Sequence, residues 1–343
     1  MVFRPGAAAS LPAELVLLGV RRPFVIASPR AFAAFEGLLN GFPRVADVPE
    51  HSSVETVESI VALAREHRAD GFVAVGGGSP SDTAKAAAIL LGEGGKLEDH
   101  ASRFTPPASL HIPELKAPKL PIATIPCTAS GAEVTPSLGV RDGRRKLLFT
   151  DVQVASRLIL IDPQANVSVP APIMLSTGMN GLAHCIEGLY SRVRTPVTDA
   201  LALHAIELFA DALSWVAREP ESVAARAALL TAAHLSGQVL LNARTCLHHA
   251  ICHALGAVTG VPHGAANAVM LPHASAYNDS PYVSRIRELQ SRLGVPTRLR
   301  DLAVPQPALR VVAEKVMEER GVYFNPRPVA GPEVVEKLLQ EAW

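Results

Sequence analysis

A short apolar segment, three glycines and an alanine-rich stretch follow one another directly, and this feature most restricts the fold of the chain. Residues 71–75 (GFVAV) predict a buried strand, 76–78 a tight turn, and the residues up to about 91 a helix. Further strands are expected at 23–27, 120–125 and 158–161, with helices over 31–39 and 54–67. Strands that alternate with helices imply a parallel sheet covered on both faces. We therefore expect an α/β, Rossmann-like first half.

The second half has a different pattern. Residues 162–172 (DPQANVSVPAP) are rich in proline and indicate a domain boundary. Beyond them strand signals nearly vanish, and 199–217, 222–243 and 307–319 have helical patterns. We expect a dinucleotide-binding α/β domain over 1–163 and an all-helical substrate and metal domain over 164–343.

Composition argues against several classes of function. The 343 residues are 48% hydrophobic and 19% charged, with a formal net charge of +0. The sequence has no basic run of the kind that neutralises nucleic-acid phosphates. No apolar run reaches the roughly 20 residues of a membrane helix, and the first ten residues lack the apolar core of a signal peptide. The four cysteines form no CxxC pair, so we expect reduced thiols and a cytoplasmic protein.

The glycine turn is a candidate phosphate site. Gly76, Gly77 and Gly78 allow close backbone approach, Ser79 is expected to cap the helix, and Asp82 stands three residues later as in a capping box. A helix N-terminus after such a turn attracts phosphate, as in a nicotinamide dinucleotide. The turn is neither GxGxxG nor a Walker loop, so glycines that serve geometry alone remain an alternative.

The segment after the first strand bears on the choice of nucleotide. Dinucleotide sites often place a carboxylate there to bind the adenosine ribose. This chain has Ser28, Pro29 and Arg30 instead, and nothing in that segment rejects a 2′-phosphate. The choice between NADH and NADPH therefore stays open.

Five polar side chains stand out in an otherwise apolar stretch: Asn180, His184, His249, His253 and His263. Asn180 and His184 are four residues apart, as are His249 and His253, so each pair shares one helix face. Imidazoles with one side-chain oxygen can hold a divalent metal such as iron or zinc. An amide oxygen is a weaker ligand than a carboxylate. Hydrogen-bonded core histidines are the alternative interpretation.

At these residues the chain resembles the iron-containing (group III) alcohol dehydrogenases. The matching motifs are GGGSPSDTAK (76–85), PCTASGAEVT (126–135), STGMNGLAHCIE (176–187), HHAICHALG (248–256) and VPHGAANAVMLPH (261–273). Fourteen residues separate His249 from His263, as they separate the third and fourth metal ligands of that family. The resemblance covers most of the chain.

The resemblance implies a dehydroquinate synthase-like fold with the site in the cleft between an α/β and a helical domain. It implies a homodimer. His184, His249 and His263 then match metal ligands, Asn180 stands where the family usually has Asp, and His253 matches the histidine beside the nicotinamide. The implied cofactor contacts are Gly77, Gly78, Ser79, Asp82 and Thr128, to which the strand-end residue Ser28 is added.

Asn180 and the C-terminal segment 324–343 are similar to the maleylacetate reductase branch. Members of this branch use NAD(P)H to reduce maleylacetate to 3-oxoadipate in the catabolism of aromatic compounds, and they are generally regarded as not needing the metal. The implied chemistry is hydride addition to an enone, with His253 or His249 stabilising the enolate or donating a proton. The chain departs from the branch at Ala129, where Tyr is usual, and at Ala250, where Lys is usual.

Several alternatives stay open. Lys146, Arg144 and Arg244 are candidate partners for substrate carboxylates, although each is equally suited to the surface. A metal-dependent alcohol dehydrogenase that tolerates Asn180 is one rival function. A relative in a biosynthetic pathway that reduces another enone or ketone is a second, and a non-catalytic nucleotide-binding protein is a third.

Overall fold

The computed structural model describes residues 1–49, 52–105, 109–143 and 145–343, and the chain forms two compact units. Unit 1 consists of Met1–Arg103, His111–Pro170 and Glu221–Leu230. Unit 2 consists of Phe104–Leu110, Ala171–Pro220 and Thr231–Trp343. The domain boundary expected at residue 163 stays a prediction.

Unit 1 is built on a parallel sheet of six strands in the order β1-β10-β7-β4-β2-β3. The strands are β1 (Val2–Phe3), β2 (Pro23–Ala27), β3 (Arg44–Val45), β4 (Gly71–Gly76), β7 (Ile122–Pro126) and β10 (Leu158–Ile161). Every residue of β2, β4, β7 and β10 is buried, as expected for strands covered on both faces. The expected parallel sheet is confirmed.

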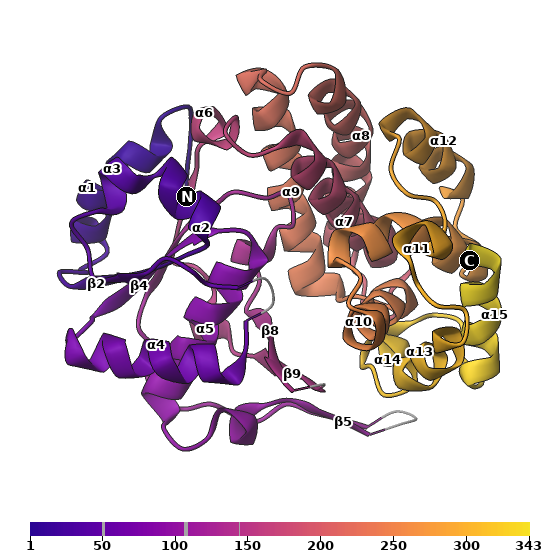
Figure 1. The fold of residues 1–343 in the computed structure, drawn as a ribbon, viewed down its shortest axis with the longest axis horizontal. Coiled ribbons are helices and arrows are strands. Elements are labelled where there is room, and N and C mark those ends of the chain that lie inside the picture. The colour runs from indigo at the N-terminus through magenta and orange to yellow at the C-terminus, as the bar shows by residue number, and fades with distance from the viewer. Residues whose placement is uncertain (50–51, 106–108, 144) are drawn as a thin grey trace. The chain divides into compact units, whose positions relative to one another are not determined.

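Helices pack on both sides of this sheet. They are α1 (Leu11–Leu17), α2 (Pro29–Ala34), α3 (Glu36–Leu39), α4 (Val54–Glu66), α5 (Gly78–Glu93) and α6 (Pro163–Asn166), with 3-10 turns at Ala7–Ser10, Leu97–His100, Ala132–Val134 and Val152–Val154. In Figure 1, α4 and α5 lie on one side of β2 and β4, and α1 to α3 lie on the other. The single helix expected over 31–39 is interrupted at Phe35, whose φ of −120° is not helical.

Two further pairs of short strands lie outside the six-stranded sheet. β8 (Ser137–Asp142) pairs antiparallel with β9 (Arg145–Thr150), and β5 (Arg103–Thr105) pairs with β6 (Ser109–His111). Neither pair was predicted from the sequence. In β8 the buried residues alternate with more exposed ones, so this strand lies at the surface of unit 1 and does not join the buried sheet.

Helices make up the second half, and no strand follows Ile161 in the part of the chain that the structure describes. They are α7 (Ala171–Tyr190), α8 (Pro196–Arg218), α9 (Val223–Ala243), α10 (Leu247–Thr259), α11 (His263–Tyr277), α12 (Val283–Leu293), α13 (Ala308–Val316), α14 (Gly321–Phe324) and α15 (Pro332–Ala342). All belong to unit 2 except the first residues of α9, which belong to unit 1. The expected all-helical second half is confirmed.

Local chemistry explains how the long helices begin. Thr195 caps α8 and forms a capping box with Thr198, and Pro196 occupies the first helical position.

Helix α7 has no exposed polar face, because almost every residue from Met174 to Gly188 is buried. A helix that is buried all round belongs to the core. Any polar side chain on α7 therefore needs a partner inside the protein.

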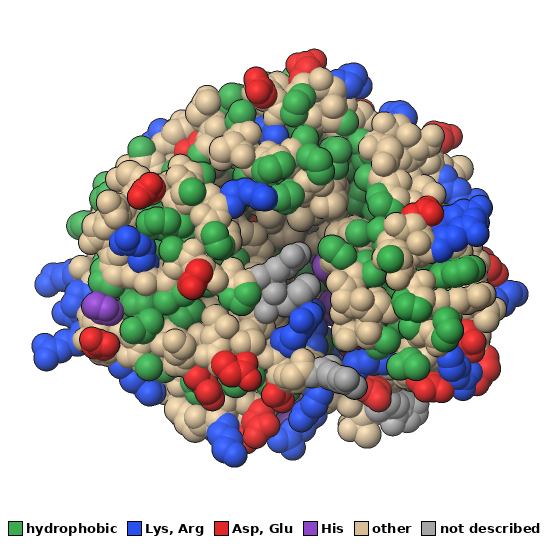
Figure 2. Space-filling model, in the orientation of Figure 1, with side chains coloured by type: hydrophobic (Ala, Val, Ile, Leu, Met, Phe, Trp, Pro, Cys, Tyr) green, Lys and Arg blue, Asp and Glu red, His purple; other side chains and the backbone are tan. Residues whose placement is uncertain are grey.

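The surface carries both signs of charge. Figure 2 shows lysine and arginine side chains mixed with aspartate and glutamate on the face that it draws, in line with the formal net charge of +0. Helix α8 (Pro196–Arg218) is long and apolar enough to cross a bilayer, but 44% of its apolar window is buried inside the protein. Helices in the core of soluble proteins can have the same length and composition, so α8 is weak support for a membrane location.

A buried carboxyl group lies in unit 1 beside α5. Glu133 is 5% exposed, and burial raises its pKa to about 7. The buried Lys85 ammonium opposes this rise and donates hydrogen bonds to the carbonyl oxygens of Ala132 at 2.7 Å and Ser137 at 3.3 Å. Ionised Glu133 is thus less stable in the folded chain than in the unfolded chain.

This burial predicts a loss of stability as the pH rises from 4.5 to about 7. A carboxyl whose pKa rises from 4.5 to about 7 on folding causes no loss below pH 4.5, a growing loss up to pH 7 and a constant one above it. The full effect is about 3 kcal/mol. In urea unfolding, Glu133→Gln should therefore match the wild type near pH 4.5 and exceed its unfolding free energy at pH 8. The exposed Glu36→Gln is the control, and an equal gain at both pH values would contradict the expectation.

Candidate functional site

The glycine turn joins β4 to α5 within unit 1. Gly76 ends the strand with φ 140°, a backbone conformation that favours glycine, and Gly77 is the N-cap of α5. A Cβ atom on Gly77 would lie 2.9 Å from Thr128 Cγ2, so the turn can approach Thr128 this closely only without a side chain. The N-cap residue Gly77 has no side chain that could cap α5. This arrangement is typical of helix N-termini that bind phosphate.

The expected capping box at Ser79 and Asp82 is wrong. Helix α5 already begins at Gly78, because Gly77 takes the extended conformation of an N-cap (φ −88°, ψ −152°). Ser79 therefore lies inside the first turn of the helix. Asp82 Oδ2 accepts a hydrogen bond from the backbone N–H of Gly139 at 3.1 Å, and Asp82 Oδ1 lies 4.0 Å from Lys85 Nζ.

The other expected cofactor residues gather around the same turn. Ser28 follows β2, and its Oγ lies 3.1 Å from the place of a Cβ on Gly76. Thr128 follows β7, and its hydroxyl lies 3.2 Å from the Ser130 hydroxyl. Because β2, β4 and β7 are adjacent parallel strands, these residues meet at the carboxyl edge of the sheet. Ligands of open α/β sheets bind at this edge.

The expected histidine array lies in unit 2 and comes from three helices. Asn180 and His184 lie on α7, His249 and His253 on α10, and His263 begins α11. The rings of His184 and His249 stack with centroids 4.6 Å apart, and those of His253 and His263 stack at 5.5 Å. Asn180 Oδ1 lies 3.0 Å from His249 Nε2. The structure therefore brings all five side chains into one cluster.

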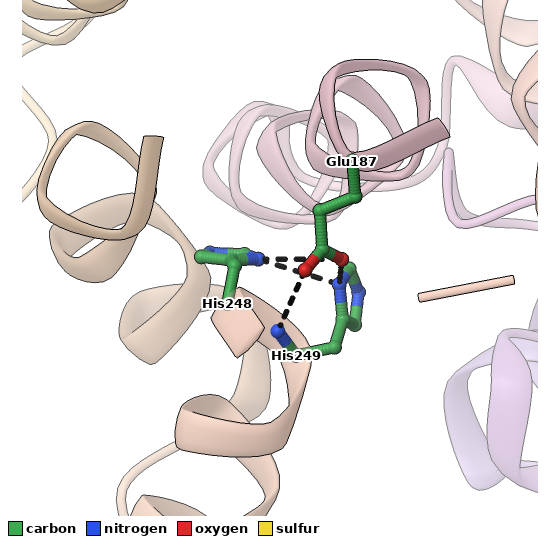
Figure 3. Close-up of side chains that lie close together, drawn as sticks. All are labelled: Glu187, His248 and His249. Carbon is green, nitrogen blue, oxygen red and sulfur yellow. Dashed lines mark hydrogen bonds and ion pairs between the residues drawn. The ribbon is translucent and has the colours of Figure 1, made fainter. Parts of the chain in front are cut away.

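A sixth polar residue, Glu187 on α7, stands beside this cluster and was not singled out from the sequence. Figure 3 shows its carboxylate pointing at His248 and His249 of α10. Glu187 Oε2 accepts a hydrogen bond from His249 Nδ1 at 2.5 Å. Glu187 Oε1 accepts hydrogen bonds from the backbone N–H groups of Cys246 at 2.9 Å and His249 at 3.4 Å. One fully buried carboxylate thus fixes both the start of α10 and the His249 ring.

Burial controls the protonation of these groups. It holds the pKa of His184 well below its usual value, and the neighbouring histidines lower it further. Burial also lowers the pKa of His248 to about 4 and raises that of Glu187. His184 and His248 are therefore neutral at neutral pH, and a neutral imidazole can bind a metal without first losing a proton.

The cluster fits a divalent metal. Among the residues that the structure describes, the buried Nδ1 atom of His184 has no hydrogen-bond partner, and such an atom needs an explanation. Glu187 on His249 Nδ1 is the kind of outer-shell carboxylate that commonly orients a metal-binding histidine, and His249 Nε2 faces Asn180 Oδ1, another oxygen that could bind the ion. Glu187, His248 and His249 also offer ligand atoms that lie within 4.8 Å of one another. The set of Asn180, His184, His249 and His263 has no negative charge, because Asn180 contributes an amide.

The expected cations belong to different units of the chain. Lys146 lies in unit 1 on β9, where a Cβ on Gly139 would overlap its side chain. Arg244 lies in unit 2 just after α9, with φ 66°, and burial lowers its pKa. Arg144 lies outside the described residues.

Comparison with known proteins matches this architecture. The model of "Iron-containing alcohol dehydrogenase" matches residues 1–163, and that of "Fe-containing alcohol dehydrogenase family, C-terminal" matches 174–294. The chain belongs to the iron-containing alcohol dehydrogenase family. The expected resemblance and the dehydroquinate synthase-like fold are therefore confirmed. The chain is an oxidoreductase. The alternative of a non-catalytic nucleotide-binding protein is set aside.

Individual relatives cover the whole chain. The maleylacetate reductase of Pseudomonas sp. strain P51 is 30% identical over 100% of this chain and 95% of its own length. The crystal structure of maleylacetate reductase from Agrobacterium tumefaciens is 28% identical with a TM-score of 0.84 and covers 100% of this chain and 95% of that one. Sulfoacetaldehyde reductase from Bifidobacterium kashiwanohense, solved with NAD+, is 23% identical with a TM-score of 0.84 over 99% of this chain and 96% of that one, which shows the shared fold.

The burial of Glu187 predicts a large effect on stability. Glu187→Ala leaves the N–H groups of Cys246 and His249 without their acceptor, so we expect a loss of about 3 to 5 kcal/mol. Glu187→Gln keeps one acceptor oxygen and should lose less. The exposed Glu207, paired with Arg285, is the control, and its replacement by Ala should cost at most about 1 kcal/mol. Equal losses for Glu187→Ala and Glu207→Ala in urea unfolding would contradict this role.

Proposed function

We propose that this chain uses NADH or NADPH to reduce the carbon–carbon double bond of an enone dicarboxylate, with maleylacetate as substrate and 3-oxoadipate as product. The observation that supports it is the neutral amide of Asn180 beside His249 Nε2, in a chain that aligns over its full length with proteins named maleylacetate reductase. An uncharged ligand set favours chemistry that does not rely on a strong Lewis acid.

The reaction needs two contributions from the chain. When bound, NAD(P)H supplies a hydride. Addition of that hydride to the β-carbon of an enone moves an electron pair onto the carbonyl oxygen, and one proton at the α-carbon then completes the saturated ketone. The protein has to stabilise the enolate oxygen with hydrogen-bond donors and to provide the proton.

His253 suits the proton transfer better than His249 does. The His249 side chain is 3% exposed, and its two nitrogens face Glu187 Oε2 and Asn180 Oδ1. The His253 side chain is 18% exposed. We assign proton transfer to His253, and to His249 the orientation of the cluster through its two contacts.

For the cofactor we propose the turn in unit 1. Gly77, Gly78 and Ser79 at the start of α5 would bind the pyrophosphate with their N–H groups, and Ser28 and Thr128 flank them. Asp82 would hold the β8–β9 hairpin against this turn through its bond to Gly139. Both nicotinamide dinucleotides remain candidates, and we propose a homodimer by analogy with the family.

The position usually held by lysine in the reductase branch has no space for one here. Ala250 is 1% exposed, and its Cβ lies 3.3 Å from the place of a Cβ on Gly321. A substrate carboxylate would therefore need another cation, and Arg244 in the same unit is our candidate. The same observation favours, as a second candidate function, reduction of a related enone or ketone in another pathway.

The proposal predicts turnover that survives metal removal. Purified protein should oxidise NADH or NADPH with maleylacetate at a similar rate before and after treatment with EDTA. A panel of primary alcohols and aldehydes, assayed with added zinc or iron, tests the metal-dependent alcohol dehydrogenase. Absence of turnover with maleylacetate, or its complete loss after chelation, would contradict the proposal.

The identity of residue 180 should set the affinity for metal. Asn180→Asp adds a carboxylate beside His249 Nε2, and we expect zinc affinity to rise at least about 10-fold by the added charge. Competition with a fluorescent chelator measures this without any activity assay. Asn242→Asp, an exposed change on α9, is the control. Unchanged affinity in Asn180→Asp would show that these side chains do not hold the ion.

A further inference from the structure

A second carboxylate contacts the histidine cluster from outside the motifs of the family. Glu319 follows α13 in the chain, 66 residues from His253, and its Oε2 lies 3.2 Å from His253 Nδ1. The Glu319 side chain is 12% exposed and that of His253 is 18% exposed, so bulk water does not surround the pair. This contact resembles the one that Glu187 makes with His249, but it lies at the more accessible ring.

We propose that Glu319 is a positioning residue that keeps one proton of the His253 ring on Nδ1, so that the proton given to the α-carbon of the substrate leaves from Nε2 and the ring that remains is the neutral Nδ1–H tautomer. This inference rests on the proposed role of His253 in the reduction. A carboxylate on one imidazole nitrogen fixes both the tautomer and the orientation of the ring. Loss of this bond weakens the preference for one tautomer and one orientation of the ring.

Packing on the ring faces supports this assignment. The His253 ring stacks on His263 at 5.5 Å with 24° between the planes, and the His249 ring meets it at 6.1 Å and 73°. These contacts restrict the tilt of the ring but leave open a flip that exchanges the places of Nδ1 and Nε2. The hydrogen bond to Glu319 selects one of the two orientations, so packing and hydrogen bonding together define a single position for Nε2.

The adjacent residue offers a matched control. Glu318 also follows α13, but its side chain is 72% exposed and pairs with Lys315 at 3.4 Å. Replacing Glu318 removes the same negative charge from the same segment without touching His253. Any effect specific to Glu319 therefore reports on its contact and not on the net charge.

The kinetic test compares Glu319→Ala, Glu319→Gln and Glu318→Ala with the wild type, using maleylacetate and the preferred nucleotide. We expect Glu319→Ala to lower kcat about 10- to 100-fold with KM values within about threefold, because proton transfer is impaired while binding is not. Glu319→Gln keeps an oxygen that accepts the Nδ1 proton, so it should recover most of the rate. Glu318→Ala should behave as the wild type. Loss through KM alone, or no rescue by Gln, would overturn the proposal.

A spectroscopic test does not depend on the substrate. Long-range proton–nitrogen NMR of protein labelled with ¹⁵N-histidine, with His253 assigned by a His253→Asn variant, distinguishes the two tautomers. We expect Nδ1–H in the wild type and in Glu319→Gln, and a shift towards Nε2–H in Glu319→Ala. An unchanged His253 tautomer in Glu319→Ala would overturn the inference. If the wild type does not turn over maleylacetate, the proposed function fails while the spectra still decide the role of Glu319.

Discussion

The buried carboxylate of Glu187 is the interaction on which the histidine cluster depends. It is fully enclosed between α7 and α10, where an unpaired charge would be very costly. Its partners are the N–H groups of Cys246 and His249 and the His249 ring, so charge, helix terminus and imidazole are satisfied together. The negative group also suits the positive end of the α10 dipole. The register of α10 against α7 therefore fixes where His249 Nε2 points.

Helical spacing in the sequence was sufficient to predict which side chains share a face, and two pairs came together as expected. Asn180 and His184 on one helix meet His249 and His253 on another, because each pair is four residues apart. The buried strands β2, β4, β7 and β10 were likewise predictable, since continuous apolar segments between turns have few other solutions. The catalytic roles of the clustered side chains remain predictions.

The sequence alone did not show which carboxylates orient these histidine rings. Glu187 and Glu319 lie 62 and 66 residues from their histidines, and no local pattern reports a contact over such a distance. Glu187 did leave one signal, because it follows His184 by three residues on a helix with few other polar groups. The cap of α5 was misplaced for a different reason. Serine is the usual N-cap, but a glycine that must approach Thr128 closely took that position.

The two carboxylates divide the cluster into parts with different chemistry. At His249 the carboxylate is enclosed and Nε2 faces the Asn180 amide, which suits a fixed structural or metal-binding role. At His253 the pair is more accessible, which suits a group that must exchange protons with a ligand. A neutral residue at 180 removes charge only from the first part. The weaker metal affinity and the proton transfer that we propose are therefore compatible in one site, because each proposed function involves its own carboxylate.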